Sequence, residues 1–425
     1  MLNFVDKGRH LSQRYVFGLF VAGLTLIGPL ASAQRATLLH DLLRRHPELF
    51  GPMLQNPAAY DIQILYTQIN RDAQNRPTFR TFRYRTDKER YFYPASTVKL
   101  PAVLLALEKL RELDKTGITR DTPMLTDSAW SGQTVVRTDS TSASGLPSVG
   151  QYARKILLVS DNDAFNRLYE WLGQCAMNER LYAKGYTNLR IVHRLSTPMT
   201  PEQNRRTNPV RFMADGRTLH QQPLQTCDRT PRAPAPIGRG IGYMRGDSLV
   251  RQPFSFTDKN YFALDDQQDM LRAILFPEAV APRKRFNLSA DDYRFLYQYM
   301  SQLPRETTFP RYDTSYYDSY CKFLLAGDSR TVFPANVRIF NKVGDAYGYL
   351  IDNAYIVDFE KGVEFLLSAV IYCNSDGIFN DDRYEYETVG LPFMANLGRV
   401  IFDYETKRKR PVKPDLSRFR VPYDQ

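Results

Sequence analysis

The segment from Tyr93 to Pro101 constrains the fold most, because it joins an aromatic, extended run to an apolar helix. The residues that follow are apolar on nearly every side, which predicts a buried helix over about 96–113 (Val98, Val103, Leu104, Leu105, Leu107, Leu110). Ser96 then lies at the helix N-terminus, where free backbone N–H groups favour developing negative charge. Lys99 follows one turn later on the same face. A buried amine can lose its proton near neutral pH and accept the serine proton, so the two residues are a candidate nucleophile and base.

A purely structural interpretation of this pair is also open. The Ser-x-x-Lys spacing arises by chance about once in a chain of this length. Ser96 also fits a helix N-cap, and Lys99 fits a solvated residue of the first turn. Other motifs must therefore decide between the two interpretations.

The N-terminus has the pattern of an export signal. Lys7, Arg9 and Arg14 precede an apolar run at 15–30, and Ala31-Ser32-Ala33 forms a cleavage site before Gln34. The alternative is a single membrane anchor, but the run is short and is interrupted by Gly and Pro. We expect a signal peptide at 1–33 and an exported mature chain, periplasmic or secreted, with no stable membrane insertion after cleavage.

The charge distribution and the cysteine spacing restrict which partners and bound groups are expected. The net charge is +11, and removal of 1–33 takes away three basic residues and one acid, which leaves +9. The basic residues are dispersed and no nucleic-acid fold signature is present, so we expect no nucleic-acid partner. No C-x-x-C or His/Cys cluster occurs, so we expect neither a metal nor a cofactor.

Four cysteines, Cys175, Cys227, Cys321 and Cys373, fall in the mature chain. In an oxidising compartment an even count predicts two disulfides, for which three pairings are possible. We favour Cys175–Cys227 together with Cys321–Cys373. The alternative is that buried thiols remain free.

The periodicity predicts strands and helices at both ends of the chain, with helices between them. We expect helices at 36–57, 149–158, 164–172, 264–277, 289–302 and 385–405, and strands at 61–70, 78–85, 336–342, 350–359 and 363–372. Residues 195–262 are rich in Pro and Gly and predict loops. The predicted fold class is α/β (α+β). An antiparallel sheet formed by about 34–94 and 263–425 is flanked by helices, with a helical lobe over about 95–205 and a loop-rich insertion over about 206–262.

Two further motifs follow the Ser96–Lys99 pair in order. Ser160-Asp161-Asn162 lies between two predicted helices, and Lys342-Val343-Gly344 ends a predicted strand. The signatures S-x-x-K, S-D-N and K-T-G belong to class A β-lactamases and penicillin-binding proteins. The sequence resembles this superfamily of serine hydrolases over roughly 36–405, and the resemblance implies a fold like that of β-lactamases and DD-peptidases.

The resemblance implies a role for each motif residue. Ser96 would attack a lactam or peptide carbonyl and become acylated, with Lys99 removing its proton. Ser160 would carry a proton to the leaving nitrogen, and Asn162 would bind the amide side chain of the substrate. Lys342 would face the substrate carboxylate. The backbone amides of Ser96 and Asp345, with Gly344 beside them, would form the oxyanion hole.

Two departures from the family pattern concern substrate binding and turnover. Val343 replaces the usual hydroxyl residue, and 343–360 contains no Lys or Arg to provide a second cation for a carboxylate. Class A enzymes activate the deacylating water with a Glu that has an Asn four residues on. Here Glu202 is the candidate acid, but its Asn, Asn204, is only two residues on.

Three functions remain open at this stage. The first is an exported hydrolase that opens β-lactams through a Ser96 acyl-enzyme. The second is a D-Ala-D-Ala peptidase or transpeptidase acting on cell-wall peptides, and the third is a penicillin-binding sensor without turnover. All three predict a small-molecule β-lactam or cell-wall peptide as the ligand, and we expect a monomer.

Overall fold

The computed structural model describes residues 38–113, 117–130, 134–229, 231 and 236–424. Its centre is an antiparallel sheet of five strands in the order β12-β13-β14-β1-β2. The strands are β12 (Val337–Ala346), β13 (Tyr349–Asp358), β14 (Val363–Tyr372), β1 (Gln63–Arg71) and β2 (Pro77–Tyr84). The N-terminal hairpin thus pairs through β1 with β14 near the C-terminus. The predicted fold class, with both ends of the chain in one sheet, is confirmed.

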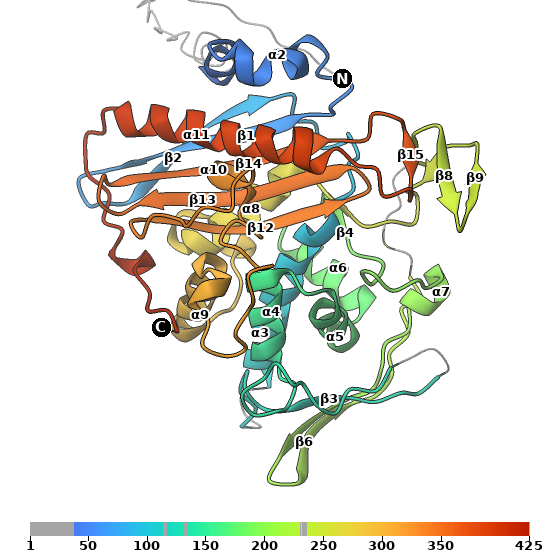
Figure 1. Ribbon diagram of the computed structural model, residues 1–425. Coiled ribbons are helices and arrows are strands. Elements are labelled where there is room, and N and C mark those ends of the chain that lie inside the picture. The colour runs from blue at the N-terminus through green and yellow to red at the C-terminus, as the bar shows by residue number, and fades with distance from the viewer. Residues whose placement is uncertain (1–37, 114–116, 131–133, 230, 232–235, 425) are drawn as a thin grey trace, which may run out of the picture.

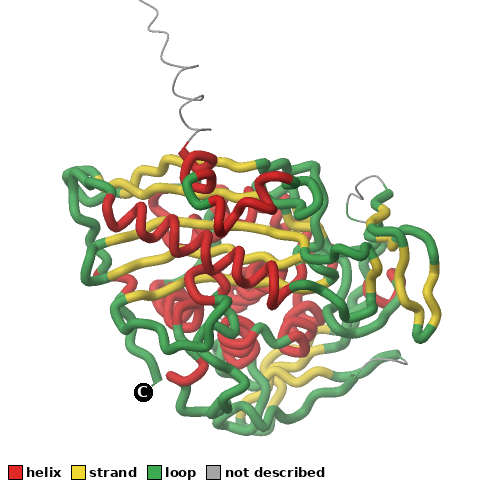
Figure 2. Tube along the Cα trace, turned by 45° about the horizontal axis from the view of Figure 1, so that its top comes forward, coloured by secondary structure: helices red, strands yellow, loops and turns green. Residues whose placement is uncertain are grey.

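Helices cover both faces of this sheet (Figures 1 and 2). On one face lie α11 (Leu391–Lys407) and α2 (Pro47–Gln55). The predicted single helix at 36–57 is wrong in one respect, because the helical segment 38–44 ends before His46 and α2 begins at Pro47. Proline lacks the N–H that a continuous helix requires, but it is well suited to the first position of a new one.

The other face carries α8 (Leu264–Leu275) and α9 (Ala290–Ser301), and beyond them the helical lobe. Its centre is α3 (Lys99–Glu112), which is buried on nearly all sides as its sequence predicts. Around it pack α4 (Val149–Val159), α5 (Asn162–Leu172) and α6 (Gln174–Ala183). Helix α6 was not predicted, because its apolar residues lack a clear helical period.

The region 195–262 is more regular than expected. It contains the short helix α7 (Pro201–Asn204), and strands β5 (Val210–Ala214) and β6 (Arg217–Gln222) pair with β3 (Met124–Thr126) in a sheet that projects from the helical lobe. The strands β7 (Gly238–Arg239), β8 (Gly242–Arg245), β9 (Ser248–Val250), β10 (Phe254–Ser255) and β11 (Tyr261–Phe262) follow. β8 pairs with β15 (Ile378–Phe379), and β11 with β4 (Leu189–Arg190). Such strands are too short to give a two-residue periodicity in sequence.

One of the two expected disulfides is present. Cys175 of α6 is bonded to Cys227, which follows β6. The predicted Cys321–Cys373 bond is absent, and both thiols are free and buried in one hydrophobic cluster. A buried free thiol packs as a small apolar side chain, so an even count alone could not distinguish the two outcomes.

The predicted signal peptide, 1–33, lies outside the described residues. Within those residues, no helix is both long and apolar enough to cross a bilayer.

Candidate active site

Ser96 lies in a tight turn that precedes the buried helix. Residues Ala95–Val98 form a 3-10 helix, and the α-helix begins only at Lys99. The turn is fixed by the hydroxyl of Thr97, which donates a hydrogen bond of 2.7 Å to the carbonyl of Pro94. Ala95 has a φ of +46°, a conformation that a non-glycine residue rarely adopts. This backbone presents Ser96 at the surface of the cleft, half-buried, while its neighbours are buried.

Lys99 is fully buried beside the second motif. Its amine donates hydrogen bonds to Oδ1 of Asn162 at 2.6 Å, to Oγ of Ser160 at 3.2 Å and to the Ser160 carbonyl. Burial lowers the pKa of the Lys99 amine well below its ordinary value, and the positive charge of Lys342 lowers it further. The lowered pKa makes it easier for Lys99 to reach the unprotonated form that a general base requires.

Ser160 occupies the turn between α4 and α5. Its backbone is left-handed, with φ 60° and ψ 37°, and the side chain of Asp161 caps α5 by accepting from the Ala164 amide at 2.7 Å. This reversal directs the Ser160 hydroxyl between two amines. Lys342 donates to Oγ of Ser160 at 2.8 Å, and Lys99 makes the longer contact of 3.2 Å to the same oxygen.

Lys342 is buried at the centre of β12, and its amine also donates to the carbonyl of Val343 at 3.0 Å. Burial lowers the pKa of Lys342 to about 8, while the neighbouring Asp345 and Asp352 oppose that shift. The amine is therefore largely protonated at neutral pH, as an electrostatic anchor needs.

Gly344 brings strand β12 against the Ser96 turn. A Cβ at this position would lie 2.7 Å from the carbonyl oxygen of Pro94 and 2.9 Å from the backbone nitrogen of Ser96. Any side chain would force the strand away from the turn. The close approach places the backbone that leads to Asp345 beside the Ser96 amide, which is the arrangement that an oxyanion hole requires.

Two cavities of about 320 and 390 Å³ share Ser96, Asn162, Asp345 and Tyr386 in their walls. The first also includes Ser160 and Cys321, and the second opens toward Ser196. The Asp345 side chain is exposed at this junction. Desolvation of its carboxyl within the cleft raises the pKa, although Lys342 and Lys99 oppose this shift. Among the described residues, no group of three or more His, Cys, Asp or Glu side chains is placed to hold a metal ion.

Residues 58–404 match the family described as "Beta-lactamase enzyme family". The chain belongs to the beta-lactamase enzyme family. No curated protein matches the sequence.

Several solved structures are similar to the chain. The beta-lactamase from Sphaerobacter thermophilus is 13% identical with a TM-score of 0.46, and the match covers 88% of this chain and 98% of that one. The beta-lactamase from Burkholderia phymatum is 13% identical, with a TM-score of 0.45 and the same two coverages of 88% and 98%. The protein PBP-A is 15% identical with a TM-score of 0.45, and the match covers 82% of this chain and 91% of that one.

The beta-lactamase-like cleft does not include Glu202, the candidate acid for deacylation. Glu202 lies in the first turn of α7, where its side chain is exposed and bonds to Thr200, and it lines neither of the cavities around Ser96. Local hydrogen bonds, first to its own backbone and then to Thr200, lower the pKa of its carboxyl. The structure therefore does not bring Glu202 to the two cavities around Ser96.

Ser196 is the loop residue that reaches the motif residues instead. Its Oγ accepts a hydrogen bond of 2.7 Å from Nδ2 of Asn162, and it lines the larger of the two Ser96 cavities. Ser196 was not predicted from the sequence, because a serine in a loop carries no signal of its own. Its position two residues after Arg194 was the available clue.

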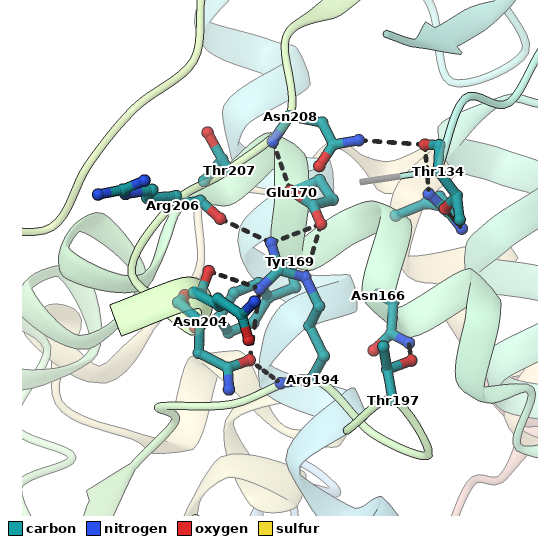
Figure 3. A network of polar contacts seen from close by, with 12 residues as sticks. Thr134, Asn166, Tyr169, Glu170, Arg194, Thr197, Asn204, Arg206, Thr207 and Asn208 are labelled. Carbon is teal, nitrogen blue, oxygen red and sulfur yellow. Dashed lines mark hydrogen bonds and ion pairs between the residues drawn. The ribbon is translucent and has the colours of Figure 1, made fainter. Parts of the chain in front are cut away.

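A buried ion pair holds this loop in place (Figure 3). Arg194 donates to Oε1 of Glu170 at 2.6 Å and to the carbonyl of Arg206 at 2.7 Å. Glu170 also accepts from the Asn208 amide at 2.5 Å, and Asn166 of the same helix donates to the Leu195 carbonyl at 2.9 Å. Helix α5 thus fixes both ends of the segment 194–208, and with it the position of Ser196.

Proposed function

We propose that this protein is an exported serine hydrolase that opens β-lactams through an acyl-enzyme on Ser96. The observation that carries the proposal is the hydroxyl of Ser160, which lies between the buried amines of Lys99 and Lys342 at 3.2 and 2.8 Å. Such a bridge can move a proton from the base to the leaving group. A structural role for the motifs would not require two buried lysines at one serine hydroxyl.

In the proposed acylation step, Oγ of Ser96 attacks the lactam carbonyl and gives its proton to the amine of Lys99. The oxyanion that forms is stabilised by the backbone amides of Ser96 and Asp345. The C–N bond then breaks, and Ser160 gives its proton to the departing nitrogen. The Lys99 ammonium returns a proton to Ser160, so that the base is regenerated and an ester remains on Ser96.

Ser196 favours a second candidate, in which the ester is long-lived. Hydrolysis of that ester needs a group that removes a proton from water, and a general base contributes about 10²–10⁴-fold. The loop places an uncharged serine beside Asn162, and Glu202 points to solvent. Slow release is typical of a penicillin-binding peptidase or sensor, so the natural substrate would then be a D-Ala-ending cell-wall peptide.

Mass spectrometry after incubation with benzylpenicillin separates these functions. A product with unmodified protein supports the β-lactamase, and a lasting adduct on Ser96 supports the peptidase or sensor. The Ser96→Ala variant should carry no adduct, whereas Ser144→Ala, at an exposed serine outside both cavities, should label like the wild type. Absence of any adduct and any product with the wild type would refute the proposed chemistry.

A further inference from the structure

A third and larger cavity continues the cleft beyond Ser196. Its volume is about 560 Å³, and it shares Tyr93, Ser196 and Tyr347 with the 390 Å³ cavity that contains Ser96. The two cavities are therefore adjacent, and a ligand at the Ser96 site lies next to this third cavity. The remaining walls come from Gln174, the segment 190–205, Pro231 and the segment 258–259.

The lining of this cavity is predominantly basic. It includes Arg190, Arg194, Arg205 and Lys259, against one acid, Asp258. The charge of Arg194 is already compensated by Glu170 at 2.6 Å. His193 also lines the cavity, but burial lowers its pKa to about 3, so the ring is neutral.

Arg190 is a buried guanidinium without a bonded carboxylate. Its side chain is buried, with the residue 2% exposed, and donates to the carbonyls of Thr257 and Lys259, while its Nε has no hydrogen-bond partner. Within the described part of the chain it forms no ion pair, and the exposed Asp258 acts on it only at longer range. A buried cation with an unsatisfied donor costs free energy unless an anion lies nearby, so the cavity has an unfilled requirement for negative charge.

Lys259 adds a second cation at the shared wall. Its amine lies 3.4 Å from the hydroxyl of Tyr347 and 5.6 Å from the centre of the Phe254 ring. It makes no ion pair with any carboxylate among the residues that the structure describes. The aromatic contacts hold the amine next to Tyr347, which lines both cavities, and a bound anion could pair with it there.

The walls of the two cavities around Ser96 are acidic, in contrast to the basic lining of the 560 Å³ cavity. The described walls of the two Ser96 cavities contain Asp345, Asp382 and Glu387 but no Arg or Lys. Val343 of the third motif supplies no hydroxyl there. The buried amine of Lys342 serves the carboxylate beside the leaving nitrogen, whereas a second carboxylate elsewhere on the ligand meets acids around Ser96 and cations at the Arg190 end.

The catalytic geometry decides which part of a substrate faces the basic cavity. The leaving nitrogen must lie next to Ser160, which lines only the 320 Å³ cavity among the three. The acyl part then extends the other way, past Ser196. We propose that the 560 Å³ cavity is a subsite for a carboxylate carried on the acyl part of the substrate, bound by Lys259 and Arg190. This inference rests on the proposed acylation of Ser96.

Three penicillins that differ at a single carbon test the subsite. Carbenicillin carries a carboxylate on the side-chain carbon next to the carbonyl, benzylpenicillin carries none, and ampicillin carries an ammonium. We expect the second-order rate constant for acylation to be about tenfold higher for carbenicillin than for benzylpenicillin, which is the size of one charge-assisted hydrogen bond. Ampicillin should be the slowest. The preference should weaken as salt screens the charges.

Variants at Lys259 assign the preference to this cavity. Lys259→Gln should reduce the difference between carbenicillin and benzylpenicillin to about threefold or less, and Lys259→Glu should make ampicillin the faster substrate. The matched control is Lys361→Gln. Lys361 is an exposed lysine whose amine also lies over an aromatic ring. It is in the turn between β13 and β14, at the end of β13 that lies away from Tyr347. The Lys361→Gln variant should leave all three rate constants unchanged.

Non-covalent binding tests the subsite independently of the acylation of Ser96. Calorimetric titration of the Ser96→Ala protein should give tighter binding of carbenicillin than of benzylpenicillin, and Lys259→Gln should remove the difference. If neither compound labels the wild type but this difference is present, the proposed acylation is wrong and the subsite stands. If labelling occurs without any carbenicillin preference, or with one that Lys259→Glu leaves unchanged, the subsite is wrong and the acylation stands.

Discussion

The side-chain amide of Asn162 donates a 2.7 Å hydrogen bond to the hydroxyl of Ser196. The other end of the same amide, Oδ1, accepts from Lys99 at 2.6 Å. Asn162 therefore connects the proposed base to the loop that follows Arg194. A serine at this point can hold Asn162 in place but cannot remove a proton from water at neutral pH.

The first prediction is that Ser196→Glu accelerates deacylation. Ser196 is exposed and lines the cavity that contains Ser96, so a longer acidic side chain has room to approach the ester. We expect the lifetime of the benzylpenicillin adduct to fall about tenfold or more, because a carboxylate near the ester can act as a general base. Time-resolved mass spectrometry measures that lifetime. The control, Ser196→Gln, has the same shape without the charge, and an equal acceleration by Gln would exclude the carboxylate as the cause.

The second prediction is that Glu202→Gln leaves turnover unchanged. The Glu202 side chain is exposed on α7 and bonds to Thr200 rather than to any residue around Ser96. Acylation and deacylation rates should both stay within about twofold of the wild type, since no transition-state contact is removed. Accumulation of a trapped acyl-enzyme in this variant, measured by stopped-flow kinetics, would restore Glu202 as the deacylating acid.

The third prediction concerns the pH dependence of acylation. The pKa of Lys342 is lowered to about 8, so its amine is charged below that pH and loses its charge as the pH rises through it. Acylation should therefore decline on the alkaline side with a midpoint near 8. The amine of Lys99 has its pKa lowered well below the ordinary value, so the acid limb should lie well below the ordinary lysine pKa.

A matched variant assigns the alkaline limb of this profile. Lys342→Arg keeps a positive charge at all accessible pH values. Its acylation rate is expected to be lower overall, because a planar guanidinium does not reproduce the contact with Ser160, but the decline near 8 should disappear. Persistence of that decline in Lys342→Arg would show that another group titrates there.

The helices and strands that could be predicted from the sequence are those with a clear apolar periodicity. The buried helix α3, the strands β12 to β14 and the shared sheet follow from apolar periodicity, which reflects burial directly. The three motifs each lie at the end of a predicted element. Short strands such as β7 to β11 carry too few residues for a period, and β8 and β11 pair with β15 and β4, which are distant in sequence.

The loop after Arg194 shows why the rest of the site could not be predicted. Glu202 was the candidate because it is the only acid between 195 and 210, although Asn204 is two residues on and not four. Its side chain is exposed in the first turn of α7, which begins with the capping box at Thr200 and Gln203. Ser196 reaches Asn162 because Arg194 is anchored to Glu170, a contact between residues of two elements that no local pattern reports.

The last prediction is that this anchor controls both stability and acylation. Arg194 and Glu170 are buried, with side-chain exposures of 2% and 5%, so Glu170→Gln leaves a buried guanidinium without its counter-charge. We expect the free energy of unfolding to fall by about 3–5 kcal/mol, as for other buried pairs that lose one partner. Hydrogen exchange in 194–208 should increase, and acylation should slow as Ser196 and Asn162 lose their fixed geometry.

Glu112→Gln is the matched control for this anchor. It makes the same substitution in the Arg180–Glu112 pair, whose side chains are 33% and 47% exposed. That change should cost about 1 kcal/mol or less, because water screens an exposed pair, and it should leave exchange in 194–208 and acylation unchanged. Denaturant titration with hydrogen exchange on both variants measures the difference. Equal losses in the two proteins would show that the Arg194–Glu170 pair does not hold the loop.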